Sequence, residues 1–292
     1  NSSGISHTEM PDFIKGGVMF MNKLALTLTT VYSEDAPFLF SGDIRDGVQY
    51  AGQTGYDCVE IHVPHPRELH IERLKDALHS ADITVSALGT GRAYVRDGLS
   101  LSSSVLSVRR DAVNRLKAFI DAAAELDSLV IVGCMRGNVS GTQSLSSVLE
   151  LLRLSMQEVD AYAARAGITL VFEPINRYEN NFLCTADSIV SFIRDNSLTA
   201  TKLMLDTFHM NIEEQNIEDT ILRTSAYTSY FHFADSNRLA PGNGHIDFKK
   251  IVACLKKVNY NGVISAECLP LPTEKAASKQ WLSSVKELLK YL

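Results

Sequence analysis

The sequence lacks the features that mark secreted and membrane proteins. Its 5 cysteines are odd in number, scattered over 292 residues and without a CxxC pair. This usage is typical of reduced, mostly buried thiols, so we expect a cytoplasmic protein. No apolar run reaches the ~18 residues that a membrane-spanning helix requires, so we expect no membrane partner.

Positive charge is sparse as well. The chain has 28 Lys and Arg against 34 Asp and Glu, a formal net charge of −6, and no dense basic run. Nonspecific nucleic-acid binding needs a cationic surface, so we expect no nucleic-acid partner. The 45% apolar content and a mean hydropathy of −0.01 are typical of a globular protein.

The beginning of the chain shows no hydrophobic period. We predict that residues 1–20 are a flexible N-terminal extension or an expression remnant, with Met19 or Met21 as the true start. The next segment, MNKLALTLTTVY, has a short, Thr-rich apolar part without a small-residue cleavage site. It is therefore predicted to be a first strand and not a secretory signal.

Short apolar runs rich in β-formers alternate with amphipathic stretches. The eight runs that we predict to be strands are 24–28, 58–63, 83–88, 129–134, 169–172, 203–205, 230–233 and 263–266. The clearest helical patterns cover 108–126, 144–166, 247–259 and 278–292. Gly167 suits a helix stop, and Thr185 and Asp247 suit helix N-caps.

This alternation implies parallel βαβ units, closed as a barrel or open as a doubly wound sheet. The 272 residues after residue 20 allow about 34 per unit, which suits eight units. No GxGxxG follows the first strand, and the polar residues follow several strands instead of one switch point. Because no linker divides the chain, we predict a single-domain α/β fold, a (β/α)8 TIM barrel over residues 21–292. The segment 29–55 is the part where the helix is hardest to place.

Four potential metal ligands each follow an apolar run, at intervals of 33, 26 and 35 residues: Glu173, Asp206, His232 and Glu267. Any one of them alone would be read as an N-cap or a loop charge. In a barrel, however, consecutive strands ~4.8 Å apart deliver their terminal side chains to one face. Three adjacent carboxylates would repel one another without a cation. The pattern therefore predicts a site for one divalent metal ion.

These residues lie in the segments EPINRYE, LDTFHMNIEE, HFADSNRLAPGNGHIDF and SAE. Their order and spacing resemble the xylose-isomerase-like sugar isomerases and epimerases, and more narrowly the ketose 3-epimerase branch (D-tagatose and D-psicose 3-epimerases). The resemblance is close in the C-terminal half, whereas the N-terminal half matches only as barrel architecture. It implies a small sugar substrate, one divalent ion (Mn²⁺ first, with Mg²⁺, Co²⁺ or Zn²⁺ as alternatives) and a homo-oligomer, either dimer or tetramer.

The resemblance also implies roles for single residues. The four residues above would bind the metal, and Glu173 and Glu267 would act as the acid–base pair on opposite faces of the substrate. His209 and Arg238 would contact substrate oxygens, and Glu179 would lie near the terminal hydroxyl of the sugar. The structural alternatives are a helix-start hydrogen bond for His209 and a surface loop charge for Arg238.

Two segments of the N-terminal half are candidates for the lining of the substrate pocket. Glu60 and His62 end the second predicted strand and point to the same side. His62 is a candidate substrate contact, whereas Glu60 either lines the pocket or is a buried charge satisfied locally. The segment 89–92, Gly-Thr-Gly-Arg, could cradle a phosphate or be only a turn. Since no stronger anion cradle is present, we expect a non-phosphorylated sugar.

The chemistry is consistent with this set of residues. Epimerisation beside a ketone removes a weakly acidic proton and returns one to the other face, so it needs a carboxylate on each side. A metal that chelates the carbonyl and a neighbouring hydroxyl stabilises the resulting enediolate. We therefore predict a metal-dependent keto-sugar epimerase or isomerase, an enzyme of the isomerase class. Aldose–ketose isomerisation needs nearly the same groups.

Three other functions are compatible with the barrel. An inosose-dehydratase-like lyase stays open, because the same groups can expel a hydroxyl. An AP-endonuclease-like phosphodiesterase is disfavoured because its trinuclear zinc site needs further His ligands, where this chain has SALGTG and GNGHID. A non-catalytic sugar-binding barrel would not need a base on each face.

Overall fold

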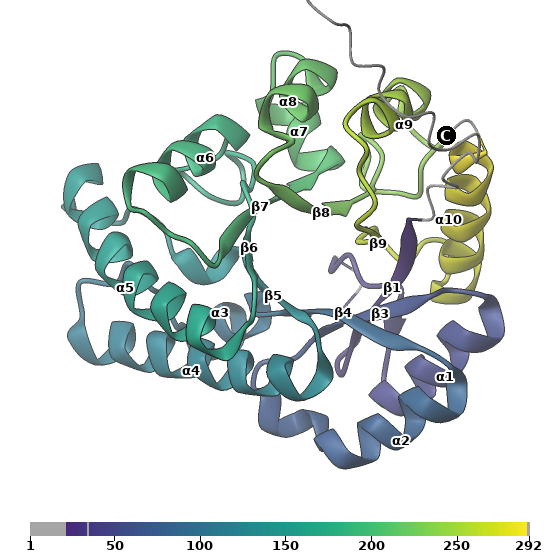
Figure 1. Cartoon of the computed structure of the whole chain (residues 1–292), viewed down its shortest axis with the longest axis horizontal. Helices are drawn as coiled ribbons and strands as arrows, with labels where there is room; N and C mark the ends of the chain where they lie inside the picture. The colour runs from purple at the N-terminus through teal and green to yellow at the C-terminus, as the bar shows by residue number, and fades with distance from the viewer. Residues whose placement is uncertain (1–21, 34, 291–292) are drawn as a thin grey trace, which may run out of the picture.

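The computed structural model describes residues 22–33 and 35–290, which form a closed parallel barrel surrounded by helices (Figure 1). The predicted extension at residues 1–20 lies outside the described residues. The sheet order is β2-β1-β3-β4-β5-β6-β7-β8-β9, and pairing of β1 with β9 closes it. The two-residue strand β2 (Phe40–Ser41) pairs with the end of β1 and is not part of the closed ring.

The eight barrel strands are those predicted from the sequence, with each end displaced by at most two residues. They are β1 (Lys23–Thr29), β3 (Cys58–His62), β4 (Thr84–Gly89), β5 (Leu129–Val132), β6 (Leu170–Phe172), β7 (Thr201–Asp206), β8 (Thr228–His232) and β9 (Val263–Ala266). Every adjacent pair is parallel. The (β/α)8 prediction is therefore confirmed.

The four predicted helices are also confirmed, although the last one begins four residues earlier than predicted. The described helices are α1 (Ile44–Thr54), α2 (Ile71–Ala81), α3 (Gly91–Asp97), α4 (Leu106–Leu126), α5 (Leu145–Ala166), α6 (Ala186–Asp195), α7 (Thr207–Glu213), α8 (Ile217–Thr224), α9 (Phe248–Lys257) and α10 (Glu274–Leu289). The side chains of Thr185 and Asp247 cap α6 and α9, and Gly167 ends α5 with φ 71°.

The first helix was hard to place because its apolar face is narrow. Helix α1 runs between the Asp43 cap and Gly55, and it buries only Ile44, Gly47, Val48 and Ala51. A Cβ on Gly47 would lie 2.9 Å from the Leu28 side chain, so a glycine takes a place that usually carries a large apolar residue. The apolar period by which a helix is predicted from sequence is therefore weak in this segment.

The barrel interior contains one small apolar cluster: Ala87, Ile131, Val171, Met204 and Tyr230. Because strand side chains alternate with a period of two, the next inward positions lie two residues further along. On β6, β7 and β8 these positions are Glu173, Asp206 and His232, at the carboxyl ends of the strands. The polar residues therefore continue the inward-facing rows at the mouth of the barrel.

In the part of the chain that is described, no helix combines the length and apolar character needed to cross a membrane.

Candidate metal centre and active site

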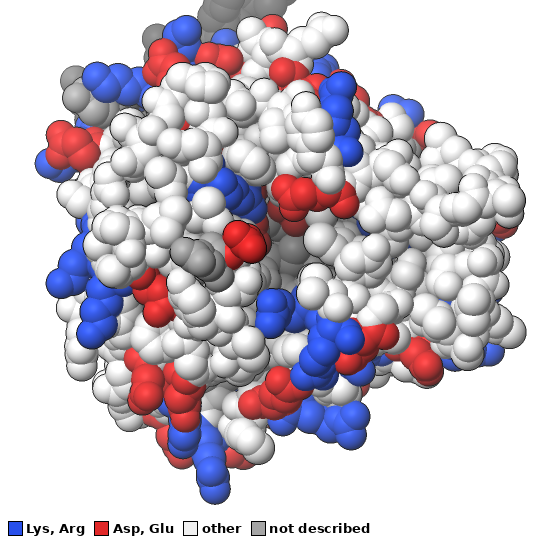
Figure 2. All heavy atoms as spheres, turned by 180° about the vertical axis from the view of Figure 1, so that it is seen from behind, with Lys and Arg blue, Asp and Glu red and all other residues white. Residues whose placement is uncertain are grey.

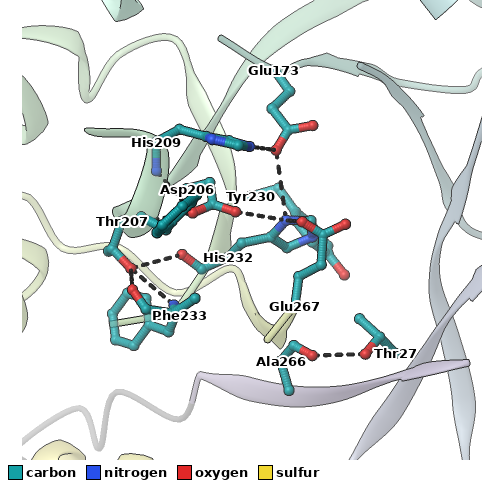
Figure 3. Close-up of polar contacts among 12 residues, drawn as sticks. Thr27, Glu173, Asp206, Thr207, His209, Tyr230, His232, Phe233, Ala266 and Glu267 are labelled. Carbon is teal, nitrogen blue, oxygen red and sulfur yellow. Dashed lines mark hydrogen bonds and ion pairs between the residues drawn. The ribbon is translucent and has the colours of Figure 1, made fainter. Parts of the chain in front are cut away.

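The structure brings the four predicted ligands together at the mouth of the barrel (Figure 3). One ligand atom from each of Glu173, Asp206, His232 and Glu267 lies within 4.8 Å of the others. Asp206 and His232 are 0% exposed, Glu173 6% and Glu267 9%. The four come from the ends of β6, β7, β8 and β9, which are neighbours in the sheet.

His232 lies at the centre of this group. Its Nδ1 is 3.1 Å from Glu267 Oε2, 3.5 Å from Asp206 Oδ2 and 3.8 Å from Glu173 Oε1. Although buried, His232 Nδ1 and Glu173 Oε1 have no hydrogen-bond partner among residues 22–33 and 35–290. Unpaired buried polar atoms are costly, and three oxygens with one imidazole nitrogen suit a divalent cation of the Mn²⁺ type. The residues therefore fit the predicted metal.

The charges of the site also favour a cation. Burial, and next the charge of Glu267, raise the pKa of Glu173 well above its ordinary value. Burial alone would lower the pKa of His232, but the carboxylates of Glu60 and Glu267 raise it well above the usual range. Both shifts reflect negative charge concentrated in a buried site. A bound divalent ion would neutralise that charge.

Arg238 also lies in this site. It is 9% exposed, and one guanidinium nitrogen donates to Asp206 Oδ2 at 2.5 Å while the other donates to Glu267. The guanidinium stacks 4.8 Å above the ring of Phe208. The alternative of a surface loop charge is therefore wrong. Its left-handed backbone, with φ 62°, turns the loop after β8 back over the barrel.

His209 lies beside Glu173, on the first turn of α7. Its Nε2 is 3.7 Å from Glu173 Oε1, and its Nδ1 is 2.8 Å from the Asn176 side-chain amide. Asn176 also donates to Glu179 Oε1 at 2.8 Å. The helix-start alternative for His209, a backbone hydrogen bond, is replaced by this side-chain network. Sequence reasoning did not assign Asn176, although it lies in the EPINRYE segment.

The structure separates the alternatives left open for Glu60 and His62: Glu60 is satisfied by neighbouring side chains and does not belong to the described lining of the cavity, whereas His62 does. Glu60 is 0% exposed and lies 2.5 Å from His62 Nε2, so its charge is satisfied locally. His62 lines the cavity beside the metal ligands, with its ring centroid 4.5 Å from that of Phe38.

The cavity has a volume of about 280 Å³. It opens on the face seen in Figure 2, where acidic and basic side chains surround a hollow. Its lining comes from the loops after β1, β4 and β5 and from the site residues His62, Glu173, Glu179, His209, Arg238 and Glu267. Its apolar patches come from Phe38, Val95, Ile131 and Ile175. A small polar molecule could reach the ligands from this side.

Arg136 was not identified from the sequence, because no pattern distinguishes it. It is fully buried, and its Nη1 donates to the backbone oxygens of Glu173 at 2.8 Å and Leu183 at 3.2 Å. Burial lowers its pKa to about 10. The guanidinium therefore hydrogen-bonds to the backbone of Glu173 and helps to hold this residue in place.

Comparison with known proteins gives the family. Residues 48–285, most of the chain, match the family described as xylose isomerase-like TIM barrel. The chain belongs to this family. It is 27% identical over 234 residues to an L-ribulose 3-epimerase of Methylomonas sp., with 78% of this chain and 81% of the relative covered. It is 25% identical over 237 residues to a 3-dehydro-D-guloside 4-epimerase of Escherichia coli, with 78% and 88% covered.

The relatives are sugar epimerases, so the prediction of an isomerase-class enzyme is confirmed. Among solved structures, a D-allulose 3-epimerase from Methylomonas sp. in complex with D-allulose superposes with a TM-score of 0.77 at 22% identity, covering 91% of this chain and 96% of that one. At this identity the superposition shows the fold alone. An AP endonuclease of Brucella melitensis also superposes, with a TM-score of 0.73, so the fold does not decide the activity.

Gly133 provides a test of how tightly Glu173 is held. A Cβ at Gly133 would lie 2.8 Å from Glu173 Oε2 and 3.4 Å from Ile175, so the carboxylate would have to move. We expect Gly133→Ala to reduce kcat/KM by roughly 10²-fold, because displacements of about 1 Å have effects of that size. Gly91→Ala is the matched control, since it lines the same cavity and a Cβ there meets nothing within 4 Å. Equal kinetics of the two variants would show that Glu173 is not confined.

Proposed function

We propose that this protein is a metal-dependent keto-sugar epimerase that inverts the carbon next to the ketone. One observation carries the proposal. Of the four clustered ligands, Glu173 and Glu267 line the cavity, whereas Asp206 and His232 do not belong to its described lining. The two residues able to reach a substrate are therefore both carboxylates, and two strands separate them in the sheet.

In this proposal, Glu173, Asp206, His232 and Glu267 hold one divalent ion, Mn²⁺ in the first instance. When bound, the ion supplies charge stabilisation for the enediolate form of the substrate. One glutamate takes the proton from the carbon beside the ketone, and the other returns a proton to the opposite face. In the reverse direction the two residues exchange roles, so both must be placed against the same carbon.

The remaining cavity residues orient the sugar. We assign substrate contacts to His209, Arg238, Glu179 and His62, because all four line the cavity beside the two glutamates. Glu179 is the most accessible of these, with 51% of its side chain exposed. That position suits the far end of a sugar whose reacting carbon lies against Glu173 and Glu267.

The names of the relatives support this reaction. Ketose 3-epimerases act beside a ketone at carbon 2, and a 3-dehydro-sugar 4-epimerase acts beside a ketone at carbon 3. The shared step is inversion next to a carbonyl. The AP-endonuclease alternative is disfavoured because β4 ends at Gly89, followed by Thr90, where that enzyme class needs a histidine ligand.

We further propose a cytoplasmic homo-oligomer, dimer or tetramer, without a nucleic-acid partner. All 5 cysteines are free thiols, which suits a reducing compartment. The net charge of −6 disfavours binding to polyanions. Light scattering of the purified protein gives the oligomeric state directly.

Proton NMR in D₂O, with the Mn²⁺-loaded protein and a panel of free ketoses and 3-keto-glycosides, tests the proposed reaction. We expect deuterium at the carbon beside the ketone of one substrate, together with the appearance of its epimer. Loss of water from the substrate would instead support the dehydratase alternative. Absence of exchange across the whole panel would contradict the proposed reaction.

A further inference from the structure

Glu60 is a buried acid close to the metal ligands that does not belong to their cluster. Three side chains lie within hydrogen-bonding distance of its carboxylate. His62 Nε2 is 2.5 Å from Oε1, and Tyr230 Oη and His232 Nε2 are both 2.9 Å from Oε2. The partners come from β3 itself and from β8 on the other side of the barrel mouth.

These contacts determine which nitrogen of His232 carries its proton. An ionised carboxylate can only accept hydrogen bonds, so His232 must donate from Nε2. When the ring gives up its second proton to bind a metal, the lone pair is on Nδ1, which is the atom that faces Glu173, Asp206 and Glu267. A carboxylate behind a ligand histidine is a recognised way to orient the ring and raise its basicity.

A second metal ion is the competing explanation. Ligand atoms of Glu60, His62 and Glu267 also lie within 4.8 Å of one another. Yet both oxygens of Glu60 already have hydrogen-bond donors. By contrast, the cluster around His232 leaves two buried atoms without a partner in the described part of the chain. The contacts therefore favour hydrogen bonding over metal binding for Glu60.

The same carboxylate also holds the histidine that faces the cavity. A Cβ on Gly89 would lie 2.2 Å from His62 Nδ1, and Phe38 lies against the ring, so His62 has little room to turn. Tyr230 is held in turn by Ser86, 2.8 Å from its hydroxyl. Side chains of β3, β4 and β8 are thus joined in one hydrogen-bonded network.

We propose that Glu60 is a positioning residue that fixes the Nε2–H tautomer and ring orientation of His232 for the metal, and at the same time fixes His62 as a wall of the substrate cavity. This inference rests on the metal site of the proposed function. Glu60 would then connect a metal ligand, His232, with a residue that lines the substrate cavity, His62. The inference also assigns no second metal ion to the site.

Glu60→Gln tests the inference through metal affinity, without an activity assay. The amide keeps the shape but presents an NH₂ group to one of the donors, so His232 loses its fixed tautomer. We expect the affinity for Mn²⁺ to fall about 10- to 100-fold, measured by titrating metal-stripped protein and following the EPR signal of free Mn²⁺. The wild-type protein should bind one Mn²⁺ per chain, and two would overturn the inference.

Asp160→Asn is the matched control. Asp160 is also a buried carboxylate, and it accepts hydrogen bonds from three residues, Thr199, Ala200 and Thr201. These lie at the start of β7, at the opposite end of that strand from Asp206. We expect this variant to bind Mn²⁺ like the wild type, which separates a local effect from a general loss of stability. Circular dichroism verifies the fold of each variant.

Tyr230→Phe removes one donor and keeps the charge of Glu60, so we expect a smaller loss of affinity, by less than about tenfold on the same scale. If Glu60→Gln does not fold, the stoichiometry of the wild-type protein still decides the question, since two Mn²⁺ per chain would overturn the inference. Folded Glu60→Gln with wild-type affinity would do the same. A wild-type protein that binds no Mn²⁺ would instead contradict the metal site of the proposed function.

Discussion

Glu173→Gln and Glu267→Gln are each expected to slow proton exchange beside the ketone roughly 10²- to 10⁴-fold, the range attributed to a positioned acid or base. Glutamine keeps the size and an oxygen ligand but cannot take a proton. Because the proposed mechanism needs a base on each face, either substitution alone should slow epimerisation to the same extent. The measurement is the rate of deuterium incorporation by NMR with Mn²⁺ at saturation.

Asp206→Asn is the control for the ligand role, because Asp206 belongs to the metal cluster but not to the described lining of the cavity. We expect its loss of activity to be partly reversed by excess Mn²⁺, whereas the glutamate variants should not recover. Near wild-type exchange in both glutamate variants would exclude the two-base mechanism. If all three variants recovered activity with excess Mn²⁺, Glu173 and Glu267 would act only as metal ligands and not as acid and base.

Removal of the metal is expected to abolish activity. Treatment with EDTA followed by gel filtration should leave three adjacent carboxylates without a neutralising ion, and Mn²⁺ or Co²⁺ should restore the rate. Binding to the folded state alone also stabilises it, by about 2.7 kcal/mol at a hundred times Kd. At about 2 °C per kcal/mol for a chain of this size, the unfolding midpoint should rise by roughly 5 °C.

Calorimetry with and without Mn²⁺ gives that shift, and Asp160→Asn again serves as a control because its carboxylate lies away from the cluster. Full activity in protein shown by elemental analysis to be free of metal would contradict the metal role. If Mn²⁺ raised the unfolding midpoint without restoring activity, the ion would bind to the protein but take no part in catalysis.

The position of the ligands along the chain was predictable because strand ends are local features. Glu173, Asp206 and Glu267 each follow a short run of apolar β-formers, and a parallel barrel brings successive strand ends to one rim. Helix α1 was harder because its buried face is narrow, with only Ile44, Gly47, Val48 and Ala51, and one of these four is a glycine. There the packing partner, Leu28, lies on β1 and outside any local pattern.

The connections across the rim were not predictable. The sequence left open whether Glu60 lined the pocket or was satisfied locally, and the structure shows it bonded to side chains about 170 residues away, at 170 from Tyr230 and 172 from His232. Arg238 was predicted to contact substrate, yet it also bonds two of the ligand carboxylates. Arg136 and Asn176 had no signal of their own.

The sequence by itself determined the class of the fold, the order of its strands and the four residues that come together at the barrel mouth, because the alternation of apolar runs and the spacing of polar strand ends depend on neighbouring residues. Only the tertiary structure decided which of the four residues face the cavity and which acid, Glu60, hydrogen-bonds to Nε2 of His232. Those relations depend on closure of β1 against β9 and on side-chain directions across the rim, for which a linear pattern carries no information.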